Sequence, residues 1–143
     1  MTVSWILKQK GRNVISALPD TPLEQAILLL ERNKIGSVVI VDGDHRVQGM
    51  VTERDIVHIL ATKGAGVLGE PVAGHMTRNI LVCTEQHSID WLMEQMTNRR
   101  FRHIPVAENG RLAGIVSIGD VVKHKLAMAE SETAQMRQYI AAG

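Results

Sequence analysis

Two short segments of the sequence place a hydroxyl residue and an aspartate three positions apart, directly after an apolar run: Thr52 with Asp55, and Ser117 with Asp120. At a strand-to-helix turn this spacing is typical of a capping box, in which the hydroxyl and the carboxylate each accept a hydrogen bond from a free backbone N–H. The same turn is suited to ligand binding. Its free N–H groups and the positive end of the helix dipole attract an anion, and a first-turn carboxylate can accept hydrogen bonds from a ribose diol. Both interpretations can hold together.

The two segments are corresponding parts of an internal repeat. Residues 46–57 (RVQGMVTERDIV) align without gaps with residues 111–122 (RLAGIVSIGDVV). The identical pairs are Arg46 and Arg111, Gly49 and Gly114, Val51 and Val116, Asp55 and Asp120, and Val57 and Val122. Upstream, with one extra residue absorbed in a turn, residues 35–40 align with 101–106. Two equivalent turns that face each other across a pseudo-twofold axis would form two clefts, each lined by both repeats.

Each half predicts the order strand, helix, strand, turn, strand, helix. In the first half, Asp20 or Thr21 is the expected helix N-cap, and Pro22 takes the first helical position. Short β-branched runs on either side of an Asp-Gly or Asn-Gly turn predict a hairpin in each half. These runs are residues 37–41 and 48–51, then 104–106 and 112–116, and the preceding strands are expected at 14–15 and 80–81.

The expected fold class is α+β, and the chain divides into four parts. These are a first repeat over residues 1–62, a glycine-rich linker over 63–71, a second repeat over 72–127 and a helical extension over 128–143. In the final helical stretch, apolar residues recur at three- and four-residue intervals or their multiples: Leu126, Ala129, Met136 and Ile140. Such a stripe usually needs a partner surface.

Composition narrows the classes of function. The chain has 143 residues, of which 45% are apolar and 3% aromatic. It has 16 Lys and Arg against 15 Asp and Glu. It therefore lacks both the basic field and the aromatic platform that nucleic-acid binding requires. Cys83 is the single cysteine, so neither an internal disulfide nor a thiolate zinc site can form. The sequence offers no metal-like histidine spacing, no set of nucleophile, base and orienting group, and no membrane span. We therefore expect a cytoplasmic, non-catalytic protein without metal, nucleic acid or membrane partners.

The sequence resembles the tandem CBS-domain pair, or Bateman module, over about residues 2–127. The strongest matches are IGSVVIVDGDHRVQGMVTERDIV (35–57) and FRHIPVAENGRLAGIVSIGDVV (101–122). The resemblance implies two β-α-β-β-α repeats packed sheet against sheet. It also implies clefts that bind adenosine-containing ligands such as AMP, ADP, ATP, NAD or S-adenosylmethionine. In this family the turn aspartate holds the ribose hydroxyls, the Ser or Thr three residues earlier lies near ribose or phosphate, and adenine lies between apolar strand residues.

Carried over by motif, the resemblance assigns residues to two nucleotide clefts, here called cleft A and cleft B. Cleft A would consist of Asn13, Ile15, Ile35, Gly36, Arg102, Ile115, Ser117, Gly119 and Asp120. Cleft B would consist of Met50, Thr52, Arg54, Asp55, Asn79, Leu81, Phe101 and Arg102.

The clefts are expected to be unequal, because Arg102 and His103 stand where the first repeat has Gly36 and Ser37. Cationic and hydrogen-bonding groups at this position favour a phosphate. The neighbouring Arg99 and Arg100 are equally well explained as a solvated basic cluster at a helix end.

The repeat also predicts the surroundings of two single residues outside the clefts. Cys83 corresponds to Ala17 and is expected to be packed, and Trp91 corresponds to Gln25 and indicates a subunit contact.

Two functions follow from the sequence. The first is a sensor module, expected to be a homodimer, that binds an adenine nucleotide in one or both clefts and transmits its occupancy to a partner protein. The second is a scaffold with empty clefts that docks a partner through its helices. A nucleic-acid binder and an enzyme rank below both.

Overall fold

The computed structural model describes residues 1–142, so of the expected C-terminal extension only Gly143 lies outside the described residues. The elements form two similar halves joined by a segment with two single-turn 3₁₀ helices, Ala65–Val67 and Val72–Gly74. The first half contains α1 (Val3–Lys10), β1 (Ser16–Ala17), α2 (Leu23–Asn33), β2 (Ser37–Val41), β3 (Val47–Thr52) and α3 (Glu53–Lys63). The second contains α4 (Ile89–Arg99), β4 (His103–Glu108), β5 (Arg111–Ser117) and α5 (Ile118–Ala142).

The strands confirm the repeat. In the first sheet β1 pairs in parallel with β2, which pairs antiparallel with β3; in the second, β4 pairs antiparallel with β5. The hairpins share a register shift at corresponding positions, after Ile40 and after Val106. In the second repeat, the strand corresponding to β1 is reduced to a single parallel bridge from Cys83 to Val106. The first strand of each half therefore lies one to three residues closer to the C-terminus than its predicted position, at 14–15 or 80–81.

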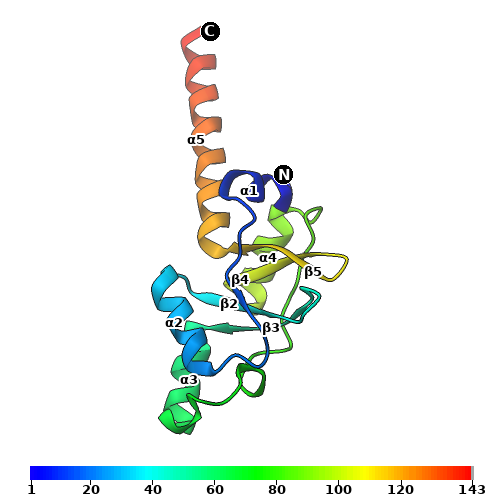
Figure 1. Ribbon diagram of the computed structural model, residues 1–143. Helices are drawn as coiled ribbons and strands as arrows, with labels where there is room; N and C mark the ends of the chain where they lie inside the picture. Colours follow the sequence, from blue (N-terminus) through cyan, green and yellow to red (C-terminus); the bar gives the residue numbers. More distant parts are fainter. Residues whose placement is uncertain (143) are drawn as a thin grey trace.

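The sheets pack face to face, with helices outside them. Figure 1 shows the strands between α2 and α3 at one end and α1 and α4 at the other. All five residues of β2 are buried. Val38 and Ile40 pack in the helical core of the first repeat, whereas Val39 and Val41 join Leu112 between the sheets. Burial on both faces explains why this strand is continuously apolar.

The segment over residues 63–71 is more than a linker, because it caps α2. This helix begins at Leu23, with Pro22 at the N-cap position and no side-chain capping bond. The backbone N–H groups of Leu23 and Glu24 donate instead to the carbonyl oxygens of Glu70 and Leu68, each at 2.9 Å. The prediction of Asp20 or Thr21 as the cap was therefore wrong. Backbone carbonyls from a distant segment satisfy the donors that a side chain would otherwise satisfy.

The final helix, α5, is one continuous element. Its first turns pack on the second repeat, where Val121 and His124 are buried, and the rest projects from the body (Figure 1). Met136, Tyr139 and Ile140 are 60%, 77% and 71% exposed. Within residues 1–142, no other segment therefore covers the apolar stripe of this helix.

One of the two single-residue expectations is confirmed, and the expected subunit contact at Trp91 stays a prediction. Cys83 is 1% exposed, which confirms that it is packed, and burial raises the pKa of its thiol to about 12. Trp91 is half-buried and stacks on His87 with a ring-centroid separation of 4.1 Å. Its indole therefore has a packing partner within the chain.

Candidate functional site

Both strand-to-helix turns form a capping box. In the first repeat the Asp55 N–H donates to Thr52 Oγ1 at 3.1 Å, and the Thr52 N–H donates to Asp55 Oδ2 at 2.9 Å. In the second, the Asp120 N–H donates to Ser117 Oγ at 3.2 Å, and the Ser117 N–H donates to Asp120 Oδ2 at 2.8 Å. The local geometry is therefore the same, and any difference between the turns comes from what surrounds them.

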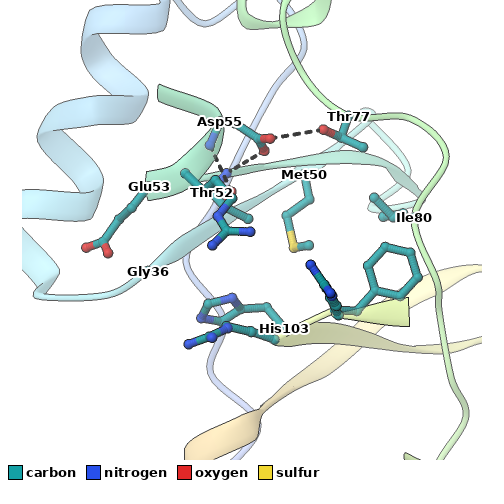
Figure 2. A pocket seen from close by; sticks show the side chains of 12 residues that line it. Gly36, Met50, Thr52, Glu53, Asp55, Thr77, Ile80 and His103 are labelled. Carbon is teal, nitrogen blue, oxygen red and sulfur yellow. Dashed lines mark hydrogen bonds between the residues drawn. The ribbon is translucent and has the colours of Figure 1, made fainter. Parts of the chain in front are cut away.

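A cavity of about 320 Å³ opens beside the first turn, in the region of cleft B. This volume is at the lower end of the range for small-molecule sites. Figure 2 shows Asp55 and Thr77 on one side of the cavity, His103 opposite them, and Met50 between. The cavity is lined by Gly36, Met50, Thr52, Glu53, Arg54, Asp55, Thr77, Ile80, Arg100, Phe101, Arg102 and His103.

The structure brings together six of the eight residues assigned to cleft B. Met50, Thr52, Arg54 and Asp55 come from β3 and the start of α3, and Phe101 and Arg102 precede β4. The two exceptions, Asn79 and Leu81, are outside the lining set. Asn79 is exposed and Leu81 packs against the core of the second repeat, because this extended segment directs Ile80 toward the cavity instead.

Several lining residues were not assigned to this cleft. Glu53 and Ile80 were not singled out, and Gly36 was assigned to cleft A. For Arg100, a phosphate-binding role and a solvated basic cluster were equally good explanations. Thr77 was also missed. Its backbone N–H donates to the Met50 carbonyl at 2.9 Å, and its Oγ1 lies 3.4 Å from Asp55 Oδ1. Because Thr77 lies outside the aligned segments, the repeat gave no indication of this role.

The cavity carries an excess of positive charge. Arg54, Arg100 and Arg102 line it, against the two carboxylates of Glu53 and Asp55. The ion pairs formed within residues 1–142 involve none of these three arginines. Their guanidinium groups are thus available to an anionic ligand.

His103 lies between the two turns. A Cβ atom on Gly36 would be 3.0 Å from its Cε1 and Nε2 atoms, so the ring packs directly on the Gly36 backbone. Burial lowers the pKa of His103 below 6.5, and Lys10 and Arg102 lower it further, while Glu53 and Asp120 oppose the shift. The lowered pKa favours the neutral ring, whose nitrogen atoms face the same cavity as Asp55.

The second turn, in the region of cleft A, has a different neighbour. Lys10 Nζ donates to Asp120 Oδ2 at 2.7 Å and to the Ile115 carbonyl at 2.9 Å. Burial acts to raise the pKa of Asp120. The hydrogen bonds from Lys10 and from the Ser117 N–H outweigh this effect and lower the pKa below its usual 3.8. Lys10 comes from α1, outside the aligned segments, and was not predicted.

The residues assigned to cleft A are spread over several environments. Ile115, Ser117, Gly119 and Asp120 lie together at the β5–α5 turn, as expected. Gly36 lines the cavity beside Asp55 instead, and Arg102, which was assigned to both clefts, also lines that cavity. Of the other three, Asn13 is exposed after α1, Ile15 accepts through its carbonyl from the Val39 N–H, and Ile35 packs on the core of the first repeat.

Two features are absent from residues 1–142. In that range no helix combines the length and apolar character needed to cross a membrane. Within the same part of the chain, no group of three or more His, Cys, Asp or Glu residues is placed to hold a metal ion.

Comparison with known proteins identifies the family. The CBS domain model matches twice, over residues 11–62 and 72–127. The chain therefore belongs to the CBS-domain family and contains a tandem pair of these domains, as the sequence predicted.

Individual relatives agree with this assignment. The crystal structure of the CBS-domain protein ATU1752 from Agrobacterium tumefaciens is 48% identical, with a TM-score of 0.82, and covers 87% of this chain and 99% of that one. The structure of CBSX2 in complex with AMP is 25% identical, with a TM-score of 0.74, and covers 90% of this chain and 98% of that one. An uncharacterized 17.7 kDa protein of Acidianus ambivalens is 34% identical over 73% of this chain, which spans only 63% of that protein.

Proposed function

We propose that this chain is a non-catalytic regulatory module that binds an adenosine nucleotide in the cavity beside Asp55. One observation carries the proposal. A carboxylate at a helix start and three arginines without carboxylate partners line one cavity, which is built from both repeats. A ribose diol can donate to the carboxylate, and phosphate oxygens can accept from the guanidinium groups.

The lining residues separate by chemistry along the cavity. Asp55 Oδ2 accepts from the Thr52 N–H, and Oδ1 has only the long contact to Thr77, so Oδ1 is the oxygen available to a ribose hydroxyl. Met50, Ile80 and Phe101 supply the apolar surface for adenine. Arg54, Arg100 and Arg102 supply the positive charge for phosphate.

The charge of the cavity favours particular adenosine ligands. CBSX2 binds AMP, and three arginines in this chain suit AMP, ADP, ATP or NAD. S-adenosylmethionine carries a sulfonium cation, which the same arginines would repel. We therefore place a phosphate-bearing nucleotide ahead of S-adenosylmethionine.

A ligand in this cavity would act on the packing of the two repeats. It would contact the β3–α3 turn of the first repeat and the residues before β4 of the second at once. Only the difference in its contacts between two packing arrangements can shift their populations. We propose that this shift is transmitted to a partner protein by a cytoplasmic homodimer formed through the helices, without nucleic acid or membrane.

A ligand-free scaffold is the second candidate function. The observation that favours it is the projecting part of α5, where Met136, Tyr139 and Ile140 are exposed. A scaffold would use this helix to dock a partner and would leave the cavity empty.

Calorimetry on nucleotide-free protein distinguishes the two functions. AMP, ADP, ATP, NAD, adenosine and S-adenosylmethionine are titrated into the unmodified chain and into Asp55→Asn, which keeps an oxygen for the capping bond and removes the charge. The proposal predicts at least about tenfold weaker AMP binding to the variant, because a charge-assisted hydrogen bond contributes about 1.5–3 kcal/mol. Asp44→Asn, an exposed substitution in the β2–β3 turn, is the matched control. Equal affinities for the two variants, or no binding by the unmodified chain, would contradict the proposal.

A further inference from the structure

Helix α1 is fixed on the second repeat although it precedes the first. Val3, Ile6 and Leu7 are at most 3% exposed in the core of the second repeat. The Val3 and Ser4 N–H groups donate to the carbonyls of His87 and Glu85 at 2.9 and 3.0 Å. The helix is therefore held at both its side chains and its backbone.

This attachment determines where α1 ends. Leu7 lies so close to β5 that a Cβ atom on Gly114 would be 2.8 Å from its Cδ2. Gly11, with φ of 95°, ends the helix, and its N–H donates to the Leu7 carbonyl at 2.7 Å. Lys10, the last helical residue, is consequently held beside the β5–α5 turn.

The Lys10 ammonium group takes the place in cleft A that a ligand hydroxyl would need. It donates to Asp120 Oδ2 and to the Ile115 carbonyl, at 2.7 and 2.9 Å. The side chains of Lys10 and Asp120 are only 32% and 21% exposed. The partial burial strengthens the attraction between the two charges.

The corresponding place in cleft B is taken by a neutral group. Met50 is the repeat counterpart of Ile115, and its carbonyl accepts from the Thr77 N–H at 2.9 Å, much as the Ile115 carbonyl accepts from Lys10. Thr77 Oγ1 is 3.4 Å from Asp55 Oδ1, a long contact between a hydroxyl and a carboxylate. A ribose hydroxyl can replace such a contact at little cost, whereas displacing an ammonium group leaves two partly buried charges unpaired.

We infer that Lys10 is an intramolecular occupant of cleft A, which restricts nucleotide binding to one site per chain, at Asp55. This inference rests on the proposed function for the identity of the ligand. Lys10 thereby determines which of two nearly equivalent turns binds nucleotide.

The test is the stoichiometry of AMP binding, measured by equilibrium dialysis on nucleotide-free protein. The unmodified chain should bind one AMP, and Lys10→Met should bind two, because the neutral side chain leaves Asp120 free. Lys10→Arg keeps the charge and should return the value to one. Lys8→Met, an exposed substitution in the same last turn of α1, is the matched control and should also give one.

Double variants identify which turn holds each nucleotide. Lys10→Met with Asp55→Asn should retain only the new site, and Lys10→Met with Asp120→Asn only the original one. If Lys10→Met still binds one AMP, or if the unmodified chain binds two, the inference about Lys10 is wrong while the proposed function stands. If the unmodified chain binds none and Lys10→Met binds one, Lys10 closes cleft A but the proposed site at Asp55 is wrong. If neither binds AMP, both are overturned.

Discussion

The β3–α3 turn and the β5–α5 turn contain the same capping box and the same aspartate but have different neighbours. Asp55 faces a cavity lined by arginines and has a long contact to the Thr77 hydroxyl. Asp120 forms an ion pair with Lys10 at 2.7 Å. The same local motif thus occurs in two different charge environments, because a segment outside the repeat places the Lys10 cation on only one of the two aspartates.

The strands that precede the two turns also have different close neighbours. Backbone lies against β3, and a side chain lies against β5. A Cβ on Gly49 would lie 2.7 Å from the Thr77 backbone oxygen, and a Cβ on Gly114 would lie 2.8 Å from the end of the Leu7 side chain. Backbone cannot move aside as a side chain can. Gly49→Ala should therefore lower the free energy of unfolding by about 3 kcal/mol and Gly114→Ala by about 1 kcal/mol, within the usual cost of overpacking.

Urea denaturation of both glycine variants checks this order. Gly43→Ala, in the β2–β3 turn where a Cβ has nothing within 4 Å, is the control. Equal losses at Gly49 and Gly114 would show that α1 is held as firmly over the second turn as Thr77 is over the first.

Placing a cation in cleft B should make it resemble cleft A. Thr77 is exposed, and Thr77→Lys should weaken AMP binding about thirtyfold, or roughly 2 kcal/mol, because an ammonium group then competes for Asp55. Thr77→Val removes only the long hydroxyl contact and should bind AMP almost normally. Calorimetry measures both, and tighter AMP binding by Thr77→Lys would mean that a cation here serves the phosphate instead of blocking the carboxylate.

The arginines distinguish the cavity from the turn at Asp120. Arg102→Gln should weaken ATP binding by about fivefold to tenfold, near 1 kcal/mol, because it removes a charge-assisted bond to phosphate. Adenosine binding should be almost unchanged. Arg32→Gln, an exposed substitution in the last turn of α2, is the control, and equal losses for ATP and adenosine would exclude a phosphate role for Arg102.

The ion pair at Asp120 should also be visible in the pH dependence of stability. The pKa of Asp120 is lowered in the folded chain, so its contribution to the free energy of unfolding is complete above about pH 4 and is lost as the pH falls. Lys10→Met raises that pKa toward its usual value. The unmodified chain should therefore be more stable than Lys10→Met near neutral pH by less than about 1 kcal/mol, since the pair is partly exposed. Urea denaturation at a series of pH values should show this difference narrowing below about pH 4. A constant difference would mean that Lys10 stabilises the chain by packing alone.

The sequence predicted the hairpins and the capping boxes because these features depend on residues close together in the chain. Asp55 and Asp120 were recognised from their spacing to Thr52 and Ser117. The alignment did not predict the bulges, which the structure places at corresponding positions of the two hairpins, after Ile40 and after Val106.

The features that the sequence missed arise from contacts between distant segments. Lys10 reaches Asp120 only because α1 packs on the second repeat, and the α2 donors bond to Glu70 and Leu68 because residues 63–71 fold back on that helix. The sequence assigned Asn79 and Leu81 to cleft B, whereas Thr77 and Ile80 line it in the structure. The cause is related. These residues lie in an extended segment with too short a pattern to determine which side chains face the cavity.

A crystal structure of the unmodified chain with AMP would show which of the two aspartates holds the ribose. We expect one nucleotide, with its ribose hydroxyls within hydrogen-bond distance of Asp55 and its phosphate among Arg54, Arg100 and Arg102, and with Lys10 still paired to Asp120. A nucleotide whose ribose lies on Asp120, with Lys10 displaced, would show that cleft A is the binding site and that both proposals are wrong.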